Sequence, residues 1–183
     1  GTPLSEASTV FEGQVTDVGV TALVDQTPGF ERTSFIRHTD FFNDEVSLLL
    51  PDGTLRKFPK PTDAALTWHH ARAFLQLKSD YRYNGKTFAQ GSLLALSFDK
   101  AGNTVAEVVF SPTPTRALSR VGPIFTRDSV LLNIQENVAS RLEEVQLLPN
   151  GQWRSRVVKT AFPGTVKVAS LHDPLVANDA LAN

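Results

Sequence analysis

Short runs in which apolar and polar residues alternate cover most of the chain, and few stretches have the three- and four-residue spacing of a helix. The clearest runs are Val46–Leu48, Phe74–Leu77, Leu93–Leu96 and Val130–Ile134. Runs of this kind, about 5–8 residues long, have the length of a β-strand. Only Thr62–Ala65 and Asn137–Glu144 have a faint helical pattern, and the second contains the β-branched Val138 between two strand patterns. We therefore interpret the second stretch as a turn followed by a strand.

Turn signals divide these runs at regular intervals. Three dipeptides typical of tight hairpins recur along the chain: Asp52-Gly53, Gly102-Asn103 and Asn150-Gly151. Such residues accept the positive φ that primed hairpin turns require. The dipeptides begin 50 and 48 residues apart, and residues 48–56 resemble residues 145–154. A second series of turns, at His69–Arg72 and Thr126–Ser129, joins further strand-like runs.

A repeat of about 40–50 residues with four short strands is typical of a β-propeller blade. The sequence therefore predicts an all-β fold, a partial β-propeller of about three and a half four-stranded antiparallel blades. The predicted blades cover residues 15–58, 65–110 and 117–158, and a partial blade begins near 164–170. The expected strands are 15–23, 31–38, 45–50 and 54–58, then 65–69, 72–78, 92–98 and 105–110, then 117–125, 128–135, 141–148 and 153–158. An insertion, Ser79–Gly91, forms a protruding hairpin at Asn84-Gly85.

Two interpretations of the repeats stay open. A closed propeller needs roughly 4–8 blades, so this chain would be part of a larger ring. Alternatively, the chain is a β-sandwich whose hairpins are regularly spaced. The chain starts at Gly1-Thr2-Pro3 rather than at Met, which favours an internal piece of a longer protein over a processed mature chain.

Composition and charge narrow the function. The chain has 183 residues, with 18 Lys and Arg against 19 Asp and Glu, for a net charge of -1. This balance argues against a nucleic-acid partner and against a membrane surface, both of which favour basic proteins. The absence of cysteine excludes disulfides, thiolate metal ligands and a cysteine nucleophile, and fits either the cytoplasm or the periplasm. No apolar run reaches the roughly 18 residues of a membrane helix.

No motif for hydrolysis or nucleotide binding stands out. A serine-hydrolase elbow needs Gly-x-Ser-x-Gly, and the nearest candidate, Gly91-Ser92, lacks the second glycine. Gly85-Lys86-Thr87 resembles the end of a phosphate-binding loop, but Asp80 stands where that loop needs a glycine. No Ser–His–Asp set is recognisable.

The remaining polar and aromatic residues fit structural roles. Of the four histidines, His38, His69, His70 and His172, the adjacent pair would point to opposite faces of a strand, or both to solvent on a turn. We expect Trp68 and Trp153 to pack in a core or between blades. We expect ion pairs at Arg32, Arg37, Arg127 and Arg141, and carboxylates bonded to local backbone amides at Asp17, Asp40 and Asp99. We therefore assign no catalytic, cofactor-binding or metal-binding residue.

Several stretches share their order and spacing with a known family. They are Val10–Gly13 with Thr16–Val18, Thr27–Arg32, Asp40–Phe42, Tyr83–Phe88 with Gly91–Ala95, Thr126-Arg127 with Leu131–Asn133, Asn137-Val138 and Arg141–Glu143, and Phe162–Val166. Together they resemble the propeller domain of the prolyl oligopeptidase family of serine peptidases, in its bacterial branch. The resemblance runs from about Val10 to Leu171.

The resemblance implies a function through a longer parent protein. In that family a seven-bladed propeller covers an α/β-hydrolase domain that carries the catalytic Ser, Asp and His, and it restricts substrates to short peptides. This chain would then be a gating segment without the triad, and its partners would be the hydrolase domain of its own parent and, through the parent, short peptides. A cut ring exposes blade faces, so we also expect self-association. Two alternatives remain, a non-enzymatic interaction module and a β-sandwich that binds a ligand such as carbohydrate.

Overall fold

The protein, in a computed structural model, is described over residues 3–99, 102–160, 168–170 and 180–182. It divides into two compact units, Gly1–Ala64 and Ala65–Asn183. Apart from one short 3-10 turn, η1 (Leu4–Glu6), the regular structure of the described residues is β, and every pairing between its strands is antiparallel. The prediction of an all-β antiparallel fold is confirmed. No helix in the described part of the chain is long and apolar enough to span a membrane.

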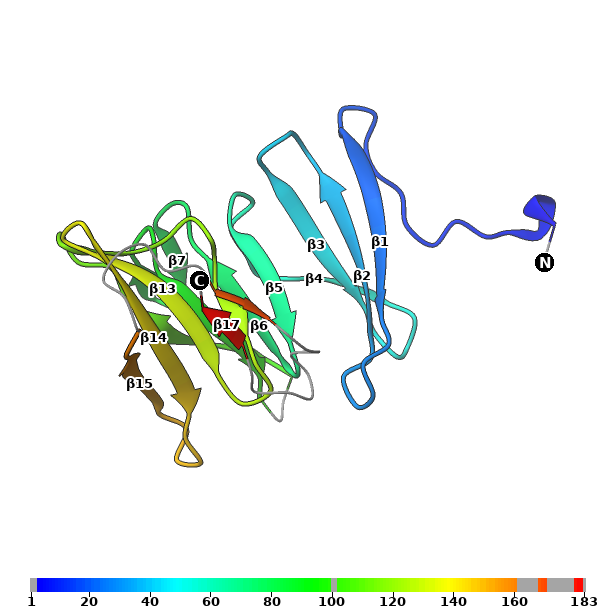
Figure 1. The fold of residues 1–183 in the computed structure, drawn as a ribbon. Helices are drawn as coiled ribbons and strands as arrows, with labels where there is room; N and C mark the ends of the chain where they lie inside the picture. The colour runs from blue at the N-terminus through cyan, green and yellow to red at the C-terminus, as the bar shows by residue number, and fades with distance from the viewer. Residues whose placement is uncertain (1–2, 100–101, 161–167, 171–179, 183) are drawn as a thin grey trace. The chain divides into compact units, whose positions relative to one another are not determined.

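The first unit is one four-stranded sheet in which neighbours in sequence are neighbours in space (Figure 1). Its strands are β1 (Gly19–Asp25), β2 (Arg32–His38), β3 (Asp44–Leu49) and β4 (Leu55–Lys57). Alternation on β3 buries Val46 and Leu48, as the sequence pattern predicts. Phe11, ahead of the first strand, stacks on Phe35 of β2 with ring centroids 4.9 Å apart.

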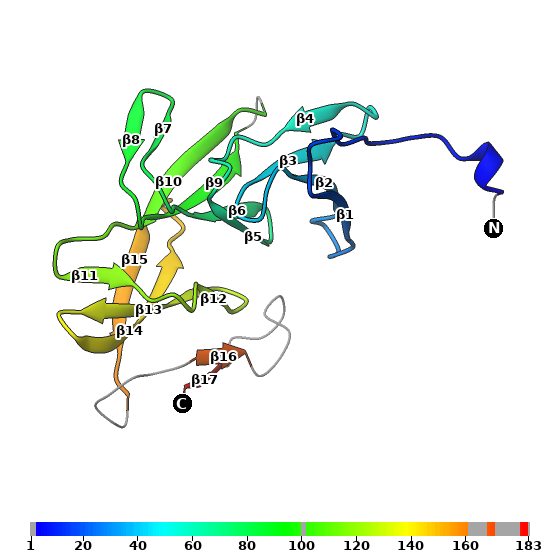
Figure 2. The ribbon, with the colours of Figure 1, turned by 90° about the horizontal axis from the view of Figure 1, so that it is seen from above.

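The second unit begins with a sheet in the order β10-β9-β6-β5, called here the middle sheet. Its strands are β5 (Ala65–His69), β6 (Arg72–Gln76), β9 (Leu93–Phe98) and β10 (Thr104–Phe110). The predicted insertion forms a separate hairpin, β7 (Tyr81–Tyr83) and β8 (Lys86–Phe88), which projects from this sheet (Figure 2). The predicted hairpin at Asn84-Gly85 is confirmed, and the φ values of 47° and 75° at these residues give its turn primed geometry.

The next sheet, called here the last sheet, runs β11-β13-β14-β15 with β12 paired to β13 beside β11. Its strands are β11 (Arg116–Leu118), β12 (Ile124–Phe125), β13 (Val130–Glu136), β14 (Ala139–Leu147) and β15 (Trp153–Val158). The prediction of one strand over 117–125 is wrong. Gly122, with φ of 61°, and Pro123, which has no N–H to donate, interrupt the ladder between β11 and β12.

Other predicted strand boundaries differ by a few residues. The first predicted strand starts at residue 15, whereas β1 starts at Gly19 because Gln14–Asp17 forms a turn closed by a 2.9 Å backbone hydrogen bond. In the predicted fourth repeat, residues 164–167 lie outside the described residues. The remainder is β16 (Val168–Ser170), which pairs with β17 (Ala180–Ala182). Asn137 has φ of 50° in a turn before β14, so the interpretation of 137–144 as turn then strand is confirmed.

The three recurring dipeptides are hairpins, but their turns are not the expected two-residue primed type. Only the glycine has positive φ, 81° at Gly53, 79° at Gly102 and 80° at Gly151. In the first hairpin the N–H of Gly53 donates to Leu50 and the N–H of Leu50 donates to Thr54, which encloses a three-residue loop. The side chains of Asp52 and Asn150 accept the backbone N–H two residues on, at 2.9 and 3.0 Å. This side-chain bond supports the longer loop that ends in a left-handed glycine.

The core of the second unit lies between the middle and last sheets. Its buried residues are Phe74, Leu93, Ala95 and Phe110 from the middle sheet and Phe125, Val130, Leu132, Ile134 and Val145 from the last sheet. Phe74 meets Phe125 edge to face, with ring centroids 4.8 Å apart. The opposite face of the last sheet buries Leu142 against Val168 of β16, so this sheet is covered on both sides.

Candidate functional site

The register of the middle sheet gathers polar side chains at one end of its core face. Arg72 and Phe74 are two residues apart on β6 and share a face, and Arg72 pairs directly with His69 of β5. Phe74 belongs to the core, so His69 and Arg72 also face the last sheet. The face of β5 and β6 that meets the last sheet is therefore apolar at Phe74 and polar at its end, where His69 and Arg72 lie.

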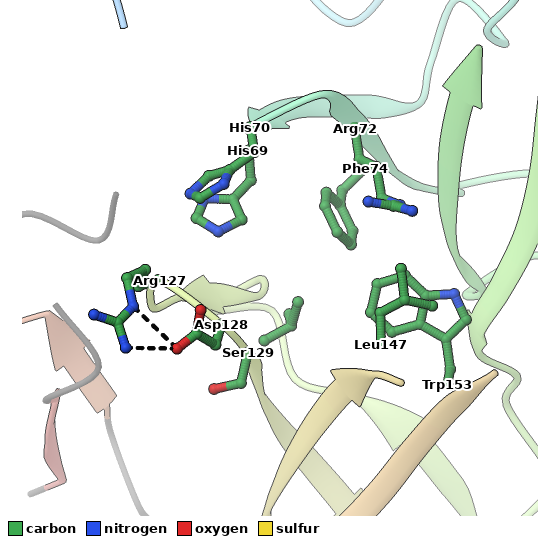
Figure 3. A pocket seen from close by; sticks show the side chains of 10 residues that line it. His69, His70, Arg72, Phe74, Arg127, Asp128, Ser129, Leu147 and Trp153 are labelled. Carbon is green, nitrogen blue, oxygen red and sulfur yellow. Dashed lines mark hydrogen bonds and ion pairs between the residues drawn. The ribbon is translucent and has the colours of Figure 1, made fainter. Parts of the chain in front are cut away.

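At that end the two sheets leave a pocket with a volume of about 110 Å³. It is lined by His69, His70, Arg72, Phe74, Arg127, Asp128, Ser129, Val130, Leu147 and Trp153. In Figure 3 the imidazoles and Arg72 come from the β5–β6 hairpin, and they face the Arg127–Ser129 turn and the pair Leu147 and Trp153 across the pocket. Pockets that enclose whole drug-sized ligands have about 300–1,000 Å³, so this one has room for part of a ligand.

The two histidines lie together, with ring centroids 4.3 Å apart. The prediction that they point to opposite faces of a strand, or both to solvent, is wrong. His69 ends β5, but His70 has φ of 52° in the turn, and this left-handed backbone breaks the alternation of side chains. His69 also stacks on Phe125 at 4.9 Å. Burial, and then the nearby His70, lower the pKa of His69, while hydrogen bonds to the backbone of Arg127 and Thr126 act in the opposite direction.

The charged groups of the pocket differ in their partners. Arg127 holds Asp128 through two hydrogen bonds of 2.9 and 3.0 Å, and both side chains are about half exposed. Arg72 is half-buried, and its guanidinium has no hydrogen bond or ion pair with another described residue. Its Nε is buried. Arg72 is therefore a cation that the described part of the chain leaves unpaired.

Trp153 closes the apolar side of the pocket. Its ring meets Phe74 edge to face, with centroids 6.1 Å apart, and its Nε1 donates to Glu107 Oε2 at 3.1 Å. Glu107 is on β10, so this hydrogen bond joins the two sheets. The prediction that Trp153 packs at an interface is confirmed. Trp68 is half-buried on β5, one residue before His69 and therefore on the other face of the middle sheet.

The opposite end of the same interface is a filled ion-pair network around Glu143, which is 4% exposed. Glu143 Oε2 accepts from Arg116 Nη2 and from Ser155 Oγ, each at 2.6 Å, and Oε1 lies 3.2 Å from Arg141 Nε. Arg116 also lies over the ring of Phe110, 4.9 Å from its centroid. Burial alone would raise the pKa of Glu143, but the hydrogen bonds from Ser155 and Arg116 hold it below its usual range.

The predicted ion pairs are present, each within one sheet or in the turns beside its strands. Arg32 pairs with Asp25 at 3.2 Å and Arg37 with Asp17 at 2.8 Å. Arg127 pairs with Asp128, and Arg141 with Glu136 and Glu143. The Arg37 hydrogen bond and the Gln14 N–H lower the pKa of Asp17 to about 2.

The predicted turn carboxylates also have their expected bonds. Asp17 accepts the N–H of Gln14 at 2.7 Å and Asp40 accepts the N–H of Phe42 at 2.7 Å. Asp99 accepts the N–H of Asn103 at 2.8 Å. These carboxylates hold turns and are not free for chemistry.

The other motifs weighed in the sequence do not meet in one place. Ser92 is 2% exposed, its N–H donates to the carbonyl of Ala89, and its carbonyl accepts from the N–H of Leu77. Lys86 begins β8 of the inserted hairpin, which has no helix after it. His38 bonds Thr21 at 3.0 Å, and His172 lies outside the described residues. Among the described residues there is no group of three His, Cys, Asp or Glu able to hold a metal ion.

Comparisons with known proteins give a consistent result. No family model matches the chain. The chain is 30% identical over 128 residues to an uncharacterized peptidase of Rickettsia prowazekii (strain Madrid E). This match covers 65% of this chain and 17% of that protein. The fold of this chain is similar to the solved structure of a post-proline cleaving enzyme from Rickettsia typhi, with a TM-score of 0.71 and 25% identity over 88% of this chain and 25% of the solved one. The chain thus spans a quarter or less of either relative, and the resemblance to the prolyl oligopeptidase family is confirmed.

Proposed function

We propose that this chain is a propeller segment of a prolyl oligopeptidase-like serine peptidase that acts on short peptides. The segment would act by exclusion, because a propeller over the active site admits only chains that fit its opening. The observation that carries the proposal is the likeness of 88% of the chain to a quarter of a post-proline cleaving enzyme. The catalytic Ser, Asp and His would lie in a hydrolase domain outside these residues.

The order of the strands supports blades rather than a sandwich. Each sheet is completed by strands that follow one another in the sequence before the next sheet begins. Among the described residues, the β7–β8 hairpin alone lies within the sequence of the middle sheet without joining it. A Greek-key sandwich passes strands back and forth between its two sheets. Propellers are built from consecutive four-stranded sheets that pack face to face. We therefore propose blades at 15–58, 65–110 and 117–158, with a partial blade from 164.

The parent's chemistry can be tested directly. The coding frame past Asn183 should contain a Gly-x-Ser-x-Gly elbow, followed by Asp and then His. The protein encoded by the whole frame should react with a fluorophosphonate serine probe and should lose that reaction when the elbow serine is replaced by alanine. The 183-residue chain, which serves as the matched control, should stay unlabelled. A frame without the elbow, or a whole protein that does not react, would favour a non-enzymatic interaction module.

Self-association is the second consequence of a partial ring. β1 is an edge strand of the first sheet and exposes Val20, Leu23 and Val24 to 45%, 51% and 64%. Exposed apolar edge strands pair readily with other chains. Light scattering of the isolated chain should give a mass that rises with concentration, and a constant monomer mass would count against this part of the proposal.

A further inference from the structure

The polar end of the interface between the middle and last sheets has an unbalanced charge. Arg127 and Asp128 neutralise each other, whereas Arg72 has no partner among the described residues. A guanidinium that is partly withdrawn from water loses hydration without gaining a hydrogen bond, which is unfavourable unless an anion is bound. The lining therefore has an excess of one positive charge when both histidines are neutral.

The shape and chemistry of the pocket limit the anion. Arginine presents a planar fork of N–H groups, which fits the two oxygens of a carboxylate. Beside Arg72, the walls from Phe74, Leu147 and Trp153 are apolar, so the rest of the ligand is apolar as well. A volume of about 110 Å³ admits a carboxylate with a short apolar group and not a long chain.

The neighbouring imidazoles suit the same ligand. His69 and His70 line the pocket on the side of the Arg127–Asp128 pair. His69 is already hydrogen-bonded to the backbone of Arg127 and Thr126, so its contribution to a bound anion is the charge that protonation adds. Burial and the proximity of His70 lower the pKa of His69, and a bound anion would offset both effects.

We propose that this pocket binds a small carboxylate that carries a compact apolar group, such as the C-terminal residue of a peptide, with Arg72 as the anchor. The proposal concerns binding alone and does not depend on the parent being a peptidase, because the site lies wholly within the second unit of this chain.

The test is an NMR titration of the 183-residue chain with N-acetyl-L-leucine, N-acetyl-L-leucinamide and inorganic phosphate. The reporter is the indole N–H of Trp153, which is one of only two indoles in the chain and is assigned from its loss in Trp153→Phe. We expect a saturable shift with N-acetyl-L-leucine at millimolar concentration. The uncharged amide should bind at least about tenfold more weakly, since it lacks the carboxylate.

Variants test whether binding depends on the guanidinium of Arg72 or only on the positive charge of the chain. Arg72→Gln should weaken the binding of N-acetyl-L-leucine at least about tenfold. Arg72→Lys keeps the charge but not the planar fork of N–H groups, and it should weaken binding about threefold. Arg82→Gln is the matched control, because Arg82 is exposed on β7 and outside the pocket lining, and it should bind as the parent chain does. Well-dispersed backbone amide resonances before titration show that each variant is folded. If Arg72→Gln does not fold, the comparison rests on Arg72→Lys.

Four results would overturn the proposal. The first is that N-acetyl-L-leucine gives no saturable shift of the Trp153 indole up to about 50 mM, and the second is that the acid and the amide bind equally well. The third is that Arg82→Gln and Arg72→Gln lose the same affinity. The fourth is that phosphate saturates the same resonance at a lower concentration than N-acetyl-L-leucine does. The last result would replace the carboxylate by a phosphate site.

Discussion

The two ends of the interface between the middle and last sheets solve the same physical problem in different ways. At the Glu143 end, formed by Arg116, Arg141, Glu143 and Ser155, one buried carboxylate receives three partners. At the His69 end, formed by His69, His70, Arg72 and the Arg127–Asp128 pair, a cation lines an open pocket. A buried polar group must be satisfied by protein, water or ligand. The Glu143 end uses protein, so it is suited to stability, and the His69 end leaves room for something else to bind.

Removing the apolar core that both ends share should have the largest effect. Leu132 is 1% exposed at the centre of this core. Leu132→Ala should lower the free energy of unfolding of the second unit by about 3 kcal/mol, through lost burial and a cavity. Urea titration followed by tryptophan fluorescence measures this, because Trp68 and Trp153 both belong to that unit. Val138→Ala, at a fully exposed turn position, is the control and should change stability by less than about 0.5 kcal/mol.

If Leu132→Ala cost no more than Val138→Ala, the two sheets would not share a core in solution. The comparison between the two ends would then lose its basis, because neither end would be part of a common interface.

The second prediction contrasts the ends directly. Glu143→Ala should cost about 2 kcal/mol, less than a fully buried pair because Arg116 and Arg141 are 27% and 38% exposed. Arg72→Ala should cost less than about 0.5 kcal/mol, because no protein partner is lost. The same urea titration measures both variants. An equal cost at the two positions would show that Arg72 has a structural partner in solution.

The sequence predicts the strands well but not the site. Alternation around Val46 and the Gly-containing turns such as Gly53 locate strands and hairpins, because both depend on residues close in sequence. β14 is different, since Leu142 and Glu143 are both buried, 3% and 4% exposed, on opposite faces of a sheet covered on both sides. A strand of this kind has no simple alternation, so the sequence does not show which face the charged residue occupies.

The pocket could not be predicted for a related reason. It depends on the pairing of Arg72 with His69, on the left-handed backbone of His70, and on the packing of one sheet against the next. Register and packing are long-range properties. The one local signal in the sequence is that the His69–Arg72 and Thr126–Ser129 turns occupy similar positions in successive repeats. This signal places the two turns near each other only if the sheets are already known to stack.

The third prediction separates the two ends by pH. The folded pKa of His69 is below its ordinary value of 6.5 and that of Glu143 is below 4.5. In both cases the unfolded chain binds the proton more readily, so stability falls as pH drops below each ordinary value. His69→Gln should flatten the upper part of the stability curve, just below pH 6.5, and Glu143→Gln the part below pH 4.5. Urea midpoints measured from pH 8 to 3 test this, and an unchanged upper slope in His69→Gln would contradict the assignment to that histidine.

The last prediction concerns the hydrogen bond from Trp153 to Glu107, which joins the two sheets beside the pocket. Trp153→Phe keeps an aromatic ring against Phe74 but removes the donor to Glu107, which should cost about 1 kcal/mol. Trp68 remains as the fluorescent reporter in the urea titration. Glu107→Gln keeps an acceptor oxygen and should cost less than Trp153→Phe. Because Glu107 has no other partner among the described residues, the double variant Trp153→Phe with Glu107→Leu should cost less than Trp153→Phe and Glu107→Leu added together. Additive costs would instead show that the indole and the carboxylate do not interact, and that packing alone joins the sheets at this position.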